Sequence, residues 1–236
     1  MTKASVQGGY TAGTDALLAA CEAVFFDIDG TLVDSNEFHV VAWDKAFRKN
    51  GRSVARHLLR MQIGKGSDVL IPSLFPGIRD EEQGTLSDAH SAIFKNRFLQ
   101  LVRPFPHAGA FVRMLHEGGK KVLLVSSSDE KEVKHYTRLL DIEECLSATV
   151  SSDDVQRTKP AGDLFAVALK KSGVDAEHPL AIGDTPYDVE AAAKCGVAAI
   201  ALRSGGFTDE RLDAAGAAAV EPDIDALFSQ RLTDPR

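Results

Sequence analysis

Two carboxylates, Asp27 and Asp29, stand directly after a short apolar run of the sequence, Ala23-Val-Phe-Phe26. In a turn opened by Gly30, this pair can hold a hard cation. It can also divide catalytic work, with one carboxylate as nucleophile and the other as general acid and base. The alternative is a strand-to-loop turn with solvated carboxylates, because Asp and Gly are common turn residues.

A second pair of carboxylates, Asp184 and Asp188, follows the apolar run Leu180-Ala-Ile182. Asp184 stands at the tip of that run, where it could bind a metal. Asp188 has a structural alternative, since Thr185-x-x-Asp188 resembles a helix capping box with Pro186 at the first helical position. The two roles are compatible, and Asp188 is a candidate for both.

Two further polar sites suit an anionic substrate. Ser126, Ser127 and Ser128 follow the apolar run 122–125, and their hydroxyls and backbone amides could hold a phosphate. The alternative is a solvated loop in which Ser128 caps the next helix. Lys159 could neutralise an anionic substrate or intermediate, whereas a lone lysine is otherwise a solvated surface charge.

The elements that would position these residues alternate between strands and helices. Continuous short apolar runs are typical of strands buried on both faces of a sheet. The runs are 23–26, 122–125, 180–182 and 198–202, with a weaker candidate at 148–152. Helices are expected at about 107–118, 130–140, 161–172 and 186–195. The alternation predicts an α/β fold with a parallel sheet, in which ligands bind outside the carboxyl ends of the strands.

The stretch from about 36 to 104 breaks this alternation. It has no convincing strand and predicts four helices, at 36–50, 53–62, 66–74 and 80–102. An all-helical insertion after the first strand suggests a second small domain. We therefore expect a disordered tail at 1–14, a core of 15–35 and 105–236, and a helical domain of 36–104.

Composition excludes several other classes of protein. The 236 residues carry a formal net charge of −7, which argues against a nucleic-acid binder held by a basic face. No run approaches the ~18 apolar residues of a membrane span. The three cysteines are widely separated and form no C-x-x-C pair, so a disulfide framework or zinc site is not expected. These features predict a soluble cytoplasmic protein, with no sign of its oligomeric state.

The order of the motifs in one chain resembles the haloacid dehalogenase superfamily over residues 22–230. Asp27-Ile-Asp-Gly-Thr-Leu-Val-Asp34 is similar to its first motif, Ser126 to its second, Lys159 to its third, and Gly183-Asp184 through Asp188 to its fourth. The helical insertion at 36–104 resembles the helical cap of this superfamily. The resemblance implies a Rossmann-like core with helices on both faces of the sheet and a mobile cap that closes over the site.

The same resemblance implies a mechanism of phosphoryl transfer. Asp27 would attack phosphorus and form an aspartyl-phosphate, while Asp29 would protonate the leaving group and then activate the hydrolytic water. The phosphoryl oxygens would be held by Ser126 and Lys159, with help from the backbone amides after Asp27. Mg²⁺ would bind Asp27, the backbone carbonyl of Asp29, Asp184, and Asp188 directly or through water. Such chemistry needs positioning and charge neutralisation above all.

Details of the motifs distinguish members of the superfamily. Asp29 argues against carbon–halogen chemistry, because the dehalogenases lack this second aspartate, so phosphatase and phosphomutase remain. The segment Asp34-Ser-Asn-Glu-Phe-His39, with Trp43, is similar to the start of the cap of β-phosphoglucomutase. However, Ile63-Gly-Lys-Gly-Ser67 lacks the expected arginine, and the fourth motif has Gly183 where the mutase has Glu. These departures favour the phosphoglycolate-phosphatase-like group.

Two residues of the helical insertion are further candidates for substrate binding. His39 could couple closure to Asp29, with packing at the hinge as the alternative. Lys65 could reach the leaving group of the substrate, with a plain exposed lysine as the alternative. The sequence thus predicts a Mg²⁺-dependent phosphatase of a small phosphorylated metabolite. The alternative functions are a sugar-phosphate mutase and a non-catalytic binding module on the same scaffold.

Overall fold

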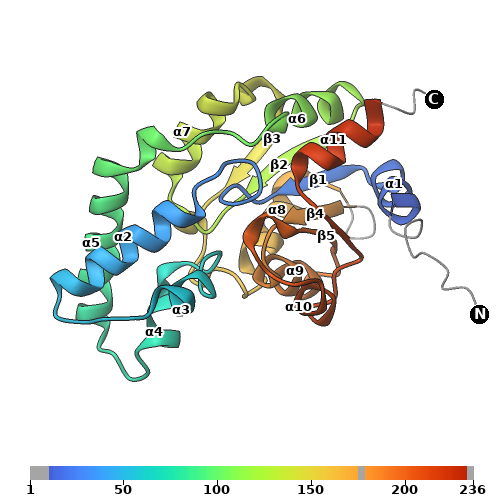
Figure 1. The fold of residues 1–236 in the computed structure, drawn as a ribbon. Coiled ribbons are helices and arrows are strands. Elements are labelled where there is room, and N and C mark those ends of the chain that lie inside the picture. Colours follow the sequence, from blue (N-terminus) through green and yellow to red (C-terminus); the bar gives the residue numbers. More distant parts are fainter. Residues whose placement is uncertain (1–10, 175–178, 233–236) are drawn as a thin grey trace, which may run out of the picture.

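A six-stranded parallel sheet forms the centre of the protein in the computed structural model, which describes residues 11–174 and 179–232 (Figure 1). The strands are β1 (Ala23–Phe26), β2 (Lys121–Val125), β3 (Leu146–Val150), β4 (Pro179–Gly183), β5 (Ala198–Leu202) and β6 (Ala219–Glu221). Their order in the sheet is β3-β2-β1-β4-β5-β6. The predicted α/β fold with a parallel sheet is confirmed.

The register of the sheet places three strand ends level with one another. Phe26 at the end of β1 pairs with Leu124 on β2 and with Ile182 on β4. The backbone amide of Asp27 continues this ladder by donating to the Ile182 carbonyl at 2.9 Å. Residues that follow β1, β2 and β4 therefore share one rim of the sheet.

Helices cover both faces of the sheet because successive strand residues point to opposite sides. Phe26 packs edge-on against Phe111, whereas its neighbour Phe25 packs against Phe165 on the opposite side. The first face carries α1 (Thr11–Ala20), α6 (Ala108–Glu117), α7 (Glu130–Leu140) and α11 (Ile224–Leu232). The second face carries α8 (Asp163–Ser172), α9 (Pro186–Ala193) and α10 (Asp209–Ala214).

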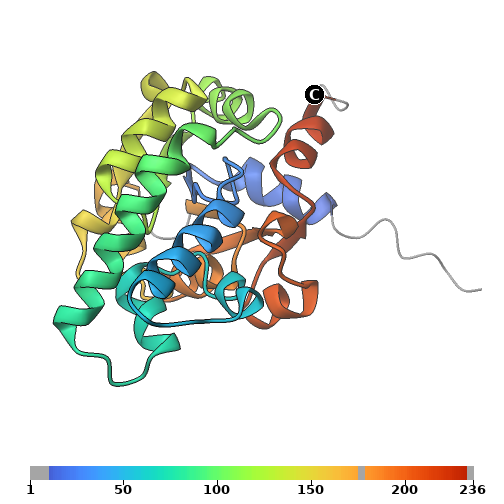
Figure 2. The ribbon, with the colours of Figure 1, turned by 60° about the vertical axis from the view of Figure 1, so that its left-hand side comes forward.

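Four of the helices between β1 and β2 form the helical insertion. They are α2 (Asn36–Lys49), α3 (Arg56–Arg60), α4 (Ser67–Leu74) and α5 (Asp80–Arg97). Helices α2 and α5 run side by side in both views (Figures 1 and 2). The insertion has its own apolar core, made of Val40, Trp43, Phe47, Leu59, Ile63, Leu70, Ile71 and Leu86. This separate core supports our proposal that residues 36–104 form a cap on a core of 15–35 and 105–236.

The expected tail at 1–14 is wrong in its last four residues, because helix α1 begins at Thr11. Residues 1–10 lie outside the described part of the chain. The hydroxyl of Thr14 is buried and donates to Glu221 Oε1 at 2.6 Å, and Leu18 joins the main core. Alanine and leucine favour helix, and burial of the leucines anchors this one to the sheet.

Several element bounds differ from the sequence prediction. The weak strand expected at 148–152 is β3 at Leu146–Val150, and the helix expected at 80–102 ends at Arg97, before a short 3₁₀ turn at Leu99–Leu101. Strand β6 and helices α10 and α11 were not predicted. Across residues 11–174 and 179–232, none of the helices combines the length and apolar character required to cross a membrane.

Candidate active site

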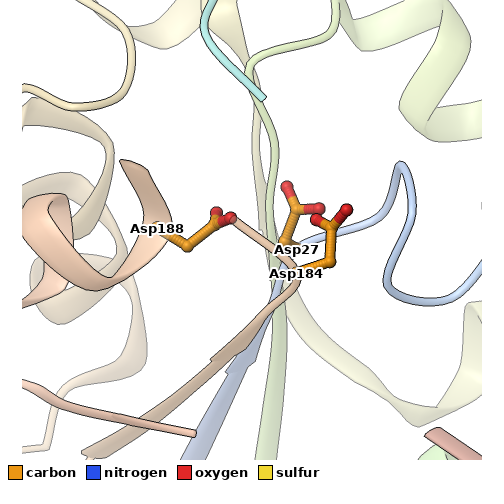
Figure 3. A group of neighbouring side chains, drawn as sticks. All are labelled: Asp27, Asp184 and Asp188. Atoms are coloured by element: carbon orange, nitrogen blue, oxygen red, sulfur yellow. The ribbon is translucent and has the colours of Figure 1, made fainter. Parts of the chain in front are cut away.

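Three carboxylates converge at the carboxyl ends of β1 and β4. Asp27 follows β1, Asp184 follows β4, and Asp188 lies in the first turn of α9. One oxygen atom of each lies within 4.8 Å of the corresponding atoms of the other two, and all three residues are buried. Figure 3 shows the carboxylates of Asp27 and Asp184 side by side, with Asp188 approaching from the helix. The topology of the sheet thus brings together residues from two distant motifs.

The charge of this three-carboxylate group is only partly balanced by the protein. Lys159 Nζ lies 2.5 Å from Asp27 Oδ1 and 2.6 Å from Asp188 Oδ1, which sets one positive charge against three carboxylates. The Thr31 hydroxyl is 3.2 Å from Asp27 Oδ2 and 3.3 Å from Asp184 Oδ1, but its single proton can satisfy only one of them. A hard divalent cation would supply the missing charge, and the all-oxygen donor set fits it.

Burial has a direct effect on the protonation of two of these carboxylates. It raises the pKa of Asp27 to about 7, with Lys159 opposing and neighbouring carboxylates adding to the rise. Burial, followed by the charges of Asp27 and Asp188, also raises the pKa of Asp184 well above its ordinary value. The group therefore resists full ionisation unless a cation is bound, which is a property of metal sites and of catalytic carboxylates alike.

Lys159 and Asp188 are held in place by contacts that the sequence only partly predicts. Lys159 is fully buried and donates to the Val125 carbonyl at 2.7 Å, so it is not a solvated surface charge. The capping box of α9 is present, since Asp188 Oδ2 accepts from the Thr185 hydroxyl at 2.6 Å and from its amide at 3.2 Å. Asp188 Oδ1 faces Lys159. One residue thus caps the helix and also belongs to the carboxylate group.

Asp184 is positioned by a residue that the sequence analysis missed. Asn36, the first residue of α2, donates from Nδ2 to Asp184 Oδ2 at 2.8 Å. Gly30, with a φ of +82°, makes room for this contact, because a Cβ there would lie 2.0 Å from Asp184 Oδ2. The only signal in the sequence was the position of Asn36 close behind the first motif. The helical insertion therefore contributes directly to the carboxylate group.

The carboxylate of Asp29 does not belong to the three-carboxylate group. It accepts from the Ser35 hydroxyl at 2.5 Å and the Ser128 hydroxyl at 2.8 Å, and lies 3.1 Å from His39 Nε2. The expectation that Ser128 caps the next helix is wrong, because the carboxylate of Asp129 caps α7 and leaves the Ser128 hydroxyl for Asp29. A metal contact of Asp29 would have to go through its backbone carbonyl, and this stays a prediction.

Asp29 and His39 form a buried ion pair. Burial acts to raise the pKa of Asp29, but His39, Ser35 and Ser128 together lower it to about 2. Burial acts to lower the pKa of His39, but the charge of Asp29 raises it above its ordinary value. The pair therefore holds one proton from about pH 2 up to the raised pKa of His39. That proton lies on His39 next to an ionised Asp29.

The His39 ring is fixed by aromatic neighbours from α5. It stacks on Phe94 with ring centroids 3.8 Å apart, and its Nδ1 lies 3.3 Å from His90 Nε2. Burial and the charge of His39 hold the pKa of His90 well below its ordinary value, so a neutral His90 accepts from the protonated His39. Trp43 also stacks on His90, with ring centroids 4.0 Å apart. The predicted contact between His39 and Asp29 is present, and its coupling to closure stays a prediction.

A cavity of about 300 Å³ separates the sheet rim from the helical insertion. Asp27, Asp29, Ser126 and Ser127 line its floor. Ser126 Oγ accepts from the Ser128 amide at 3.0 Å and is almost fully buried. The structure thus brings the predicted phosphate-binding serines beside Asp27, at the lower end of the size range of small-molecule sites.

A segment of the insertion, residues 61–68, which includes the start of α4, docks on residues adjacent to the motifs. Asp68 accepts from the Thr158 amide at 2.9 Å and from the Thr158 hydroxyl at 2.5 Å, and that hydroxyl accepts from the Gly66 amide at 2.9 Å. The Ser127 hydroxyl donates to the Gly64 carbonyl at 3.3 Å, and Tyr187 donates to the Met61 carbonyl. Thr158 precedes Lys159, so the insertion contacts the segment that carries the buried lysine.

Asp68→Asn is therefore expected to lower kcat/KM by about 10- to 100-fold, because hydrogen bonds to a charged group contribute about 1.5–3 kcal/mol. The matched control is Asp80→Asn, since Asp80 lies equally in the first turn of a helix but is exposed. Steady-state kinetics and the melting temperature of both variants are the measurement. Unchanged kcat/KM in a folded Asp68→Asn would contradict a role for this contact.

Comparison with known proteins places the chain among hydrolases. The model of the family described as haloacid dehalogenase-like hydrolase matches residues 24–202. Phosphoglycolate phosphatase of Pseudomonas savastanoi pv. phaseolicola is 29% identical over 191 residues, covering 77% of this chain and 69% of that protein. Phosphorylated carbohydrates phosphatase of Thermotoga maritima is 26% identical, covering 75% and 82%. The crystal structure of a hydrolase from Pseudomonas syringae superposes with a TM-score of 0.83 at 29% identity, covering 89% and 97%.

Proposed function

The chain belongs to the haloacid dehalogenase-like hydrolase family, and we propose that it is a Mg²⁺-dependent phosphatase that acts on a small phosphorylated metabolite through an aspartyl-phosphate. The observation that carries this proposal is the environment of Asp27. Its carboxylate stands at the cavity floor, with Lys159 on one oxygen and two further carboxylates that call for a cation. Both relatives named above are phosphatases by name, which supports the same reaction type.

Asp27 is the proposed nucleophile. Its carboxylate oxygen forms a bond to phosphorus while the bond from phosphorus to the ester oxygen breaks. Lys159, held by the Val125 carbonyl, balances the charge of Asp27 and of the transferred group. Ser126 and Ser127 hold phosphoryl oxygens. Mg²⁺ bound by Asp27, Asp184 and Asp188, with the Asp29 carbonyl, would supply charge neutralisation at the phosphoryl group.

Asp29 is the proposed general acid and base. The ester oxygen leaves as an alkoxide and needs a proton, and the Asp29–His39 pair holds one at neutral pH. In the proposed step the proton moves from His39 to the Asp29 carboxylate and from there to the leaving oxygen, and Asp29 later removes a proton from the water that attacks the aspartyl-phosphate. The second step releases inorganic phosphate and restores the Asp27 carboxylate.

One experiment separates this proposal from its two alternatives. The protein is incubated with Mg²⁺ and a hexose 1-phosphate, with a trace of the hexose bisphosphate. A phosphatase releases inorganic phosphate, whereas a mutase returns an isomeric sugar phosphate and a binding module returns neither. A panel of phosphate esters read by phosphate release then ranks the substrates. The names of the relatives suggest two classes for this panel, phosphoglycolate and phosphorylated carbohydrates.

Removal of the metal is expected to reduce phosphate release to background, because three buried carboxylates then face a phosphate with only Lys159 to balance them. The measurement is activity after treatment with EDTA and after readdition of Mg²⁺. A second readout is the melting temperature, which Mg²⁺ should raise for the wild type through binding to the folded state. Asp184→Asn serves as the matched variant and should respond less. Full activity in EDTA would refute the metal assignment.

We propose a cytoplasmic location, since Cys21, Cys145 and Cys195 are free thiols, as suits a reducing compartment. The proposed partner is the small phosphorylated metabolite alone. Neither a nucleic acid nor a membrane is part of the proposal.

A further inference from the structure

The cavity has a second wall, opposite the phosphate site, that is rich in hydroxyl groups. Ser67 begins α4, and Ser87 and Ser91 lie one turn apart on the face of α5 that lines the cavity. The Ser87 hydroxyl donates to the Ser67 hydroxyl at 2.9 Å. Each hydroxyl can both donate and accept, which is the pattern that a polyhydroxylated ligand needs.

Besides Asp27 and Asp29, four carboxylates line the cavity. Asp88 stands on the second wall, whereas Asp129, Glu132 and Asp153 come from the core. Asp129 pairs with Lys95, and Asp153 accepts from the Glu130 amide at 3.0 Å. Asp88 is exposed and forms no ion pair with any described residue. A negatively charged leaving group would thus meet carboxylates, at least one of which has no counterion.

The cationic groups among the described residues that line the cavity are already engaged with other protein groups. No arginine is among them, and the one lysine is Lys65. The ammonium of Lys65 donates to Gln62 Oε1 at 2.6 Å and lies 4.6 Å from the centroid of the Tyr187 ring, and neither partner lines the cavity. His39 and His90 are occupied with Asp29 and with each other. The positive charge of the site is concentrated at the phosphate end.

We infer that the substrate is a phosphate ester whose leaving group is uncharged and rich in hydroxyls, and that the enzyme discriminates against esters whose leaving group carries a carboxylate. This inference rests on the proposed phosphatase function. It selects a phosphorylated polyol or sugar over a phosphorylated hydroxy acid such as phosphoglycolate. A buried or half-buried carboxylate without a partner is unfavourable, whereas a hydroxyl finds both donors and acceptors here.

A pair of esters that differ in one group provides the test. Glycerol 3-phosphate and 3-phosphoglycerate share a three-carbon chain, but one ends in a hydroxymethyl group and the other in a carboxylate. With the full chain and Mg²⁺, kcat/KM for glycerol 3-phosphate is expected to exceed that for 3-phosphoglycerate by about tenfold or more. Equal or faster turnover of the carboxylate ester would overturn the inference.

A second pair of esters tests a cationic leaving group. Turnover of phosphoethanolamine, which ends in an ammonium group, is compared with turnover of 2-hydroxyethyl phosphate, which ends in a hydroxyl. A preference for the amine would overturn the assignment of an uncharged leaving group. p-Nitrophenyl phosphate reports the chemistry independently of the second wall. If it and all the other esters release no phosphate, then the proposed phosphatase function itself fails, a result distinct from the wrong order of preference.

Two variants test the residues that carry the inference. Asp88→Lys places a cation at the second wall and is expected to raise kcat/KM for 3-phosphoglycerate, relative to glycerol 3-phosphate, by about tenfold. Asp80→Lys on the same helix lies outside the cavity and is the control for charge alone. Lys65→Gln should leave the ratio of the two values within about twofold. A selective loss on 3-phosphoglycerate in Lys65→Gln would show that Lys65 serves a carboxylate, and would contradict the inference.

Discussion

Asp27→Asn is expected to abolish phosphate release, with a loss of about 10⁴-fold or more, as is typical when a nucleophile is removed. The amide has nearly the shape of the carboxylate and keeps an oxygen for Lys159, so positioning survives but the attacking charge does not. The fold should survive as well, because the change removes one of three mutually repelling buried carboxylates. The measurement is phosphate release at saturating Mg²⁺, together with the melting temperature.

The control for Asp27→Asn is Asp34→Asn, since Asp34 lies in the same motif but is exposed. This variant should keep most of its activity. Acid quenching of the wild type during turnover should trap a phosphoryl group on the peptide that contains Asp27, and the Asp27→Asn variant should trap none. Wild-type phosphate release by a folded Asp27→Asn protein would rule out the covalent mechanism.

Asp29→Asn is expected to slow turnover of an alkyl phosphate by about 10²- to 10⁴-fold, the range typical of general acid–base catalysis. The amide oxygen can still accept from one of the Ser35 and Ser128 hydroxyls, and the amide NH2 group can donate to the oxygen of the other, so the loss reports proton transfer rather than structure. Unlike Asp27→Asn, this variant should accumulate aspartyl-phosphate from p-nitrophenyl phosphate. The nitrophenolate leaves without a proton, but the hydrolytic water still needs a base.

The pH dependence gives a second readout for Asp29. The pKa of His39 is raised by Asp29, so the pair keeps its proton at low pH and loses it as the pH rises through that raised value. Wild-type turnover of an alkyl phosphate should therefore fall across that rise in pH. In Asp29→Asn this alkaline decline should vanish, because the Asp29–His39 pair no longer supplies the proton to the leaving group. If Asp29→Asn turned over an alkyl phosphate within about tenfold of the wild-type rate, the assignment of Asp29 as general acid and base would be contradicted.

The sequence was sufficient to predict the rim of the sheet because its signal is local. Apolar runs that end in Asp27, Ser126 or Asp184 predict buried parallel strands, and such strands place their carboxyl ends at one edge. The capping box of Asp188 is equally local, since its partners lie within one helical turn. Local sequence patterns did not predict two elements for which the pattern is short or the stabilising contacts are distant. Strand β6 has only three residues, and the isolated helix α1 is held by contacts with Glu221 near the other end of the chain.

The amino-acid sequence by itself determined which chemical groups stand at the strand ends, and in which order. The tertiary structure decided the environment of each group. It buries Lys159 between two carboxylates and brings Asn36 to Asp184. It also pairs the Asp29 carboxylate with His39 rather than with the three-carboxylate group. It also directs the Lys65 ammonium to Gln62 and Tyr187, so that hydroxyls and carboxylates are left facing the leaving group. The charge, the pKa and the orientation of each of these side chains depend on its burial and on its distance from atoms remote in the chain. Local spacing in the sequence does not specify either of these.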